Sequence, residues 1–97
     1  MAEVAKIVLM RAKPGGGPAL EAALRALILE SGKEEGSVCC ELHSGSADSE
    51  QFMVYERWSG DAAFDAHMAQ PHVAVFLAAT GELLAGQPEV LAFDHLP

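Results

Sequence analysis

The segment from Val4 to Ala12 (VAKIVLMRA) predicts a strand that is apolar on both faces, and this limits how the chain can fold. Side chains alternate along a strand, so one face carries Ala5, Ile7 and Leu9 and the other carries Val4, Val8 and Met10. A strand with two apolar faces is typical of a sheet that is covered on both sides. We therefore expect helices on one face of the sheet and a second subunit on the other.

Turn residues and apolar spacing divide the remaining chain into six further elements. The glycines and prolines of residues 13–18 end the first strand, and Pro18 suits the first turn of a helix whose apolar stripe runs from Leu20 to Ile28. This helix should end within residues 31–35. We expect strands at 37–44 and 51–58, a short helix at 60–69 with Ser59 as its N-cap, a helix at 72–84 after a break at Pro71, and a last strand at 89–94.

The resulting order is β-α-β-β-α-β, with the second helix broken in two. This order is typical of the α+β ferredoxin-like fold, in which helices cover one face of a four-stranded antiparallel sheet. The length of 97 residues suits a single domain spanning residues 1–97. A domain of this size buries a limited core, and burial in a homodimer would supplement its stability.

Charge and segment composition exclude several classes of function. Fourteen acidic residues against six basic ones give a net charge of −8, which disfavours binding to nucleic acid and to anionic membrane surfaces. No signal peptide precedes the first strand and no apolar run is long enough to span a bilayer, so we expect a cytoplasmic protein. The adjacent cysteines Cys39 and Cys40 point to opposite faces of their strand and are interpreted as packing residues.

The strand at residues 51–58 places polar and aromatic candidates on one face, which carries Phe52, Val54, Glu56 and Trp58. A carboxylate between Val54 and Trp58 is costly to bury unless it is paired or protonated. Glu56 could therefore anchor an imidazole or act as a base, or it could accept backbone N–H groups at a helix start. Trp58 could present its ring to a planar substrate, or it could close one end of the core.

Two histidines flank the break at Pro71. On the short helix Phe64, His67 and Met68 share one face, which should look toward the sheet. His72 begins the next helix, and Phe76 follows one turn later. Either imidazole could transfer a proton, with capping or packing as the competing role. The spacing of His67 and His72 is not that of a helical zinc pair and no third ligand lies nearby in the sequence, so we expect no metal site.

At these residues the chain resembles a known family. Tyr55-Glu56-Arg57-Trp58, Ala63-Phe64, His67, Pro71-His72 and Phe76 are similar to the signature of the antibiotic biosynthesis monooxygenase domain, and the turn at Lys13-Pro14-Gly15 and the stop at Glu35-Gly36 also match. The resemblance implies a dimeric α+β barrel with a pocket between sheet and helices. It also implies a cofactor-independent monooxygenase that oxidises a small quinol or aromatic polyol with dioxygen.

On this interpretation Trp58 positions the substrate ring, His67 or His72 takes its proton, and Glu56 orients the imidazole. Phe52, Val54, Phe64 and Phe76 would bind the substrate. Relatives that degrade haem use an Asn on the first strand and a His on the last helix, both of which are missing here. Two alternatives stay open. One is a small-molecule isomerase on the same scaffold, because the last residues, His95-Leu96-Pro97, loosely resemble the tail of an isomerase branch of the family. The other is a non-catalytic ligand-binding dimer.

Overall fold

The computed structural model describes residues 2–97 and contains seven elements in the predicted order. They are β1 (Val4–Arg11), α1 (Gly17–Ser31), β2 (Ser37–Ser44), β3 (Gln51–Trp58), α2 (Asp61–Met68), α3 (Pro71–Leu83) and β4 (Glu89–Asp94). The three strands predicted after the first one have the predicted bounds, and each helix agrees with its prediction to within a few residues. Local periodicity and turn residues therefore identified every element correctly.

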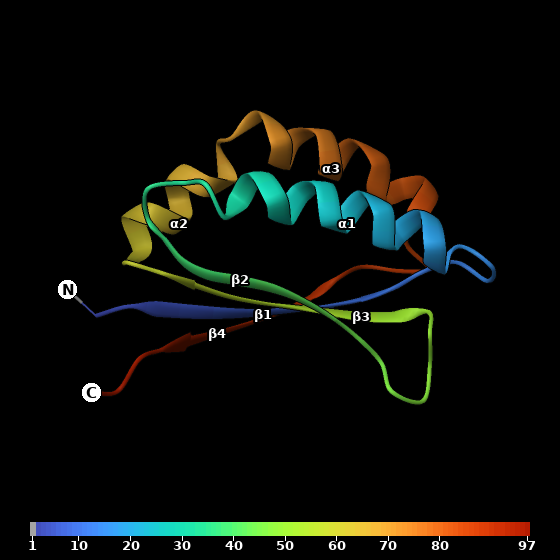
Figure 1. The fold of residues 1–97 in the computed structure, drawn as a ribbon, viewed down its shortest axis with the longest axis horizontal. Helices are drawn as coiled ribbons and strands as arrows, with labels where there is room; N and C mark the ends of the chain where they lie inside the picture. Colours follow the sequence, from blue (N-terminus) through green and yellow to red (C-terminus); the bar gives the residue numbers. More distant parts are fainter. Residues whose placement is uncertain (1) are drawn as a thin grey trace.

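The four strands form one antiparallel sheet in the order β2-β3-β1-β4. All the helices lie on the same face of this sheet, and the start of β1 and the end of β4 lie side by side (Figure 1). This arrangement confirms the ferredoxin-like α+β fold. The register sets Lys6 opposite Glu56 and Val4 opposite Trp58, so the end of β3 that carries the candidate residues pairs with the start of β1.

The start of α2 differs from the prediction. The helix begins at Asp61 with Gly60 as its N-cap, and no side chain forms a capping hydrogen bond. The prediction of Ser59 as the N-cap is therefore wrong. The reason is a tertiary contact. The backbone N–H of Ser59 donates to the carbonyl of Gly36 at 2.9 Å, so Ser59 connects β3 to the loop before β2 and the helix starts after it.

The covered face of the sheet is buried in strict alternation along β3. Phe52, Val54, Glu56 and Trp58 are all buried, whereas the residues between them are only partly buried. Toward one end, Phe52 and Val54 pack with Leu20 and Leu24 of α1 in the apolar core. At the other end, which α2 covers, Val4, Glu56 and Trp58 of the sheet and His67 of α2 are buried. The predicted sharing of one face is confirmed, and the polar groups gather at one end of it.

Among residues 2–97 no helix combines the length and the apolar character that are needed to cross a bilayer.

Candidate functional site

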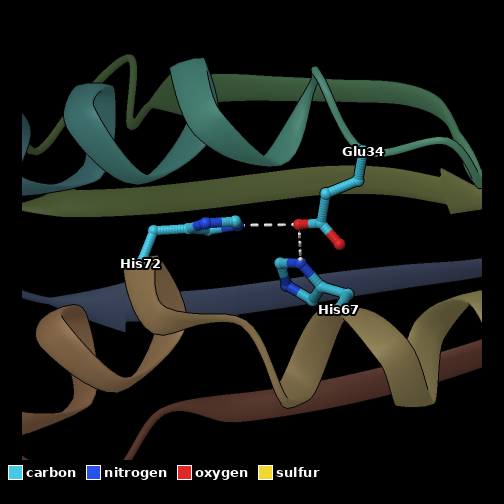
Figure 2. A group of neighbouring side chains, drawn as sticks. All are labelled: Glu34, His67 and His72. Carbon is cyan, nitrogen blue, oxygen red and sulfur yellow. Dashed lines mark hydrogen bonds and ion pairs between the residues drawn. The ribbon is translucent and has the colours of Figure 1, made fainter.

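One oxygen atom of Glu34 contacts two imidazoles. Its Oε2 lies 2.7 Å from Nδ1 of His67 and 2.7 Å from Nε2 of His72 (Figure 2). Glu34 is in the loop between α1 and β2, His67 is in the last turn of α2, and His72 is in the first turn of α3. The three side chains are mostly buried, with 12%, 7% and 18% of their surface exposed, respectively. Three segments that are distant in sequence thus converge on one carboxylate.

The loop that carries Glu34 is held by turn hydrogen bonds and by a close approach to α2. The N–H of Glu34 donates to the carbonyl of Ser31, and the N–H of Ser37 donates to the carbonyl of Glu34. A Cβ atom at Gly36 would lie 2.3 Å from the Cβ of Ala63 in α2, so only glycine allows this packing. The close approach brings the loop against the helix that carries His67.

Aromatic contacts fix the ring of His67. Its centroid lies 4.4 Å from that of Trp58, with the planes inclined by 34°, and 5.9 Å from that of Phe64. Trp58 is fully buried and also meets Phe64 edge-on at 6.3 Å. The imidazole is therefore oriented both by the hydrogen bond to Glu34 and by packing between two aromatic rings.

The second buried carboxylate, Glu56, has a different partner from the predicted one. Its Oε1 accepts a hydrogen bond from the indole Nε1 of Trp58 at 3.2 Å. Burial raises the pKa of Glu56, and the bond from Trp58 and the charges of His67 and Lys6 oppose this rise. The sequence suggested that Glu56 orients an imidazole. In the structure the carboxylate that is hydrogen-bonded to both histidines is that of Glu34.

Lys6 completes the charged part of the site. It lies opposite Glu56 in the register of β1 and β3, and its Nζ lies 4.3 Å from the centre of the Phe64 ring, within the range of a cation–π contact. The buried end of the sheet therefore holds a negative and a positive side chain on neighbouring strands around the aromatic cluster.

Two surface hollows meet at His72. The larger has a volume of about 790 Å³ and is lined mainly by polar and small residues, among them Glu30, Glu34, Ser59, Gln70 and His72. The smaller has a volume of about 260 Å³ and lies between α1 and α3, where it is lined mostly by apolar residues, including Leu27, Val75 and Phe76. Glu30 and His72 line both hollows. A small molecule can thus reach His72 from an apolar side and from a polar side.

The structure brings together some of the predicted site residues and separates others. His67, His72, Trp58, Glu56 and Phe64 lie in one connected cluster, and Phe76 lines the apolar hollow beside His72. The two remaining predicted substrate contacts, Phe52 and Val54, pack in the apolar core. Phe52 is six positions from Trp58 on the strand, or about 20 Å at 3.3 Å per residue, so one small substrate cannot touch both.

The hydrogen-bond pattern assigns the protons of the two imidazoles. An ionised carboxylate only accepts, so Nδ1 of His67 and Nε2 of His72 each donate a proton to Glu34. In a neutral imidazole the other ring nitrogen then keeps its lone pair. His72 lines both hollows, so its ring borders space that a small molecule can enter.

Glu34 and Lys6 are the residues that sequence reasoning missed. Lys6 interrupts the apolar residues on the covered face of β1, and that interruption was a readable signal. Glu34 gave no comparable signal, because a glutamate in a polar loop is ordinary. Its Oε2 and the nitrogens of His67 and His72 that face it lie within 4.8 Å of one another, which supplies the third donor that the sequence lacked near the histidines.

Comparison with known proteins gives consistent matches. The sequence model of the antibiotic biosynthesis monooxygenase family matches residues 4–79. A Mycobacterium tuberculosis protein named "Putative monooxygenase Rv0793" is 35% identical over 81 residues, which cover 84% of this chain and 79% of that protein. Its solved structure has a TM-score of 0.91 at 28% identity over 98% of this chain and 96% of that one. The structure of PA3566 from Pseudomonas aeruginosa has a TM-score of 0.94 at 31% identity and covers 100% of this chain and 97% of that one.

Proposed function

The chain belongs to the antibiotic biosynthesis monooxygenase family, and from this premise we propose that it is a cofactor-independent monooxygenase that oxidises a small quinol or aromatic polyol with dioxygen. The family supports an oxidoreductase of the monooxygenase type. The substrate class, the independence from a cofactor and the roles of individual residues are our proposal, as is a homodimer as the working form.

The observation that carries the proposal is the imidazole pair on Glu34. His72 lies where the two hollows meet, and its Nε2 is held by the Glu34 carboxylate at 2.7 Å. A histidine that is oriented by a carboxylate and lies at the wall of a cavity is a suitable arrangement for general base catalysis. His72 is therefore the proposed base, and Glu34 is the residue that orients it.

The reaction needs a base because the phenolate is a far better electron donor than the phenol. His72 removes a hydroxyl proton, and the resulting anion transfers an electron to dioxygen. One oxygen atom then enters the ring and the other leaves as water, so that a hydroquinone and one dioxygen give a hydroxyquinone and one water. All four electrons that dioxygen accepts come from the substrate, so the reaction needs no external reductant. The protein contributes orientation, desolvation and the proton acceptor.

The apolar hollow suggests a substrate with one ring. Its volume of about 260 Å³ is just below the range of roughly 300–1,000 Å³ that is typical of pockets for drug-sized ligands. A single aromatic ring against Leu27 and Phe76 would place a hydroxyl group at His72, with its polar substituents in the larger hollow. Trp58 is fully buried, so in this proposal it does not touch the substrate but supports His67 from below.

The test is oxygen consumption by chelator-treated protein over a panel of monocyclic hydroquinones and benzenetriols. We expect uptake above the spontaneous rate, at one dioxygen per substrate, with one labelled oxygen atom from ¹⁸O₂ in the product. His72→Ala should lower the rate by roughly 100-fold or more, which is the usual contribution of a general base. Glu34→Gln should lower it less, because the imidazole is kept but loses the ionised partner that orients it.

The chain offers a matched control for these variants. His43 also lies beside a carboxylate, with Nε2 3.3 Å from Oε1 of Glu41, but both side chains are exposed on β2. His43→Ala should leave the rate unchanged.

Trp58→Phe tests the support of His67 and should reduce the rate without changing the substrate preference. Uptake that survives in both His67→Ala and His72→Ala would remove the catalytic role of the histidines, and no uptake across the panel would favour the isomerase or ligand-binding function.

A further inference from the structure

We propose that Glu34, His67 and His72 form a binding site for a divalent transition-metal ion, with Zn²⁺ as its representative. The proposal departs from the sequence-based expectation of no metal site, which depended on the lack of a third ligand near the two histidines. The three donor atoms are Oε2 of Glu34, Nδ1 of His67 and Nε2 of His72, and all of them lie within 4.8 Å of one another.

The type of donor favours this class of ion. Two imidazole nitrogens and one carboxylate oxygen form a donor set that holds zinc at sites with an open fourth position, and the same set suits other first-row divalent ions. The set contains no thiolate, and it has too few oxygen donors to favour Ca²⁺ or Mg²⁺.

The distances allow an ion to enter after a small adjustment. Zinc–ligand bonds of about 2.0–2.2 Å set tetrahedral ligands roughly 3.4 Å apart. Without an ion, the carboxylate oxygen lies 2.7 Å from each nitrogen. Glu34 would thus move away from both rings by roughly 0.7 Å, on a side chain with several rotatable bonds that projects from a loop. The two nitrogens lie within 4.8 Å of each other, and His72 would turn toward His67 to bring them to the same spacing. His67 supplies the rigid part of the site because it packs against Trp58.

The surroundings provide an entry path and a favourable potential. Glu34 and His72 line the larger hollow, so the open coordination position would face solvent-accessible space. Glu30 and Glu35 line the same hollow, and Lys33, the basic residue among those that line it, is paired with Glu30 at 3.2 Å. A cleft with this excess of carboxylates attracts cations, and the net charge of −8 adds to the effect.

A metal ion and the proposed base chemistry exclude each other, and this consequence rests on the proposed function. The ion takes the lone pairs of Nδ1 of His67 and Nε2 of His72, which carry protons in the hydrogen-bonded state. Each neutral ring then keeps its proton on the opposite nitrogen. For His72 this is the nitrogen that would accept the substrate proton. A bound ion therefore inhibits the oxidation and does not serve as its cofactor.

The direct test is calorimetric titration of chelator-treated protein with Zn²⁺, with Co²⁺ as a second probe whose visible absorption reports nitrogen and oxygen ligation. We expect one ion per chain. His72→Ala and Glu34→Gln should weaken the binding of Zn²⁺ at least 100-fold, while the matched variants His43→Ala and Glu41→Gln at the exposed pair on β2 keep the wild-type affinity. Circular dichroism of each variant confirms that the loss is not unfolding.

Each outcome has one meaning. No saturable binding of Zn²⁺ at micromolar concentration, or equal binding by wild type and His72→Ala, overturns the metal site. Binding that is lost in His43→Ala also overturns it, because the ion would then be at the exposed pair. If Zn²⁺ binds but the chelator-treated protein consumes no oxygen with any quinol, the metal site stands and the proposed function is removed. Oxygen uptake that is unchanged at saturating Zn²⁺ refutes the inhibition even if the ion binds.

Discussion

The indole nitrogen of Trp58 donates a hydrogen bond to the carboxylate of Glu56, two residues earlier on the same face of β3, and both side chains are buried. The pair shows how this chain keeps a charged group at the covered end of its sheet. The indole provides one donor, and Lys6 on the neighbouring strand provides a positive charge. Burial nevertheless dominates, and the pKa of Glu56 is raised.

Glu56→Gln is expected to stabilise the protein at neutral and alkaline pH. Glutamine keeps an oxygen for the indole N–H and removes a buried charge, which should add on the order of 1 kcal/mol to the free energy of unfolding at pH 8. Because folding raises the pKa of Glu56, its carboxyl stabilises the native state most below the unfolded value of about 4.3, and this contribution is lost as pH rises through the folded pKa. The advantage of the variant should therefore grow with pH.

Urea denaturation of both proteins between pH 4 and pH 8 measures this difference. Glu41→Gln removes the same charge from an exposed position on β2 and shows what net charge alone contributes. A difference between Glu56→Gln and wild type that stays constant over this range would contradict the assignment.

Gly36→Ala and Gly81→Ala should have opposite effects on stability. At Gly36 a new Cβ would meet the Cβ of Ala63 at 2.3 Å, so the loop and α2 must separate, at a cost of about 1–3 kcal/mol. At Gly81, within α3, a new Cβ meets no atom within 4 Å, and alanine should stabilise the helix by roughly 0.5–1 kcal/mol. Thermal unfolding of the two variants compares the same added methyl group in two surroundings, and equal shifts would be inconsistent with tight packing at Gly36.

The adjacent cysteines should differ in reactivity. Burial and the nearby Glu56 raise the pKa of Cys40 to about 12. Cys39 lies on the other face of β2, where burial and Glu41 also raise the pKa of its thiol. Because the thiolate is the reactive form, native Cys39→Ser, which retains only Cys40, should react with a disulfide reagent at pH 8 at least about tenfold more slowly than Cys40→Ser. The two variants should react equally fast in denaturant. Equal rates in the native state would show that Cys40 is accessible.

The helix-free face of β1 and β4 is the expected dimer interface. Phe93 and Leu91 on β4 are 53% and 39% exposed and pair with Ala5 and Ile7 of β1, and together they extend the apolar face predicted from β1. We expect light scattering at micromolar concentration to give the mass of two chains, and Phe93→Asp to give the mass of one. Leu29→Asp, at another exposed apolar position on α1, is the matched control and should stay dimeric. A monomeric wild type would exclude the dimer.

The sequence alone determined the elements, their order and the face of each strand on which a side chain lies. Alternation in residues 51–58 predicted that Glu56 and Trp58 share the covered face, and both are buried there. Helical spacing predicted that His67 faces inward, and it is buried. These properties are local, since the backbone geometry of one strand or helix fixes the direction of its side chains, so a single segment contains the information.

The tertiary structure decided which of these residues meet. Glu34 is 33 positions from His67 and 38 from His72, and no periodicity connects a loop residue with two helix ends. Their contact depends on the packing of the loop against α2 at Gly36. In the folded chain Trp58 is fully buried and His72 lines the two hollows. The distance between separate elements follows from how their side chains fit together, and the sequence pattern of each element does not contain it.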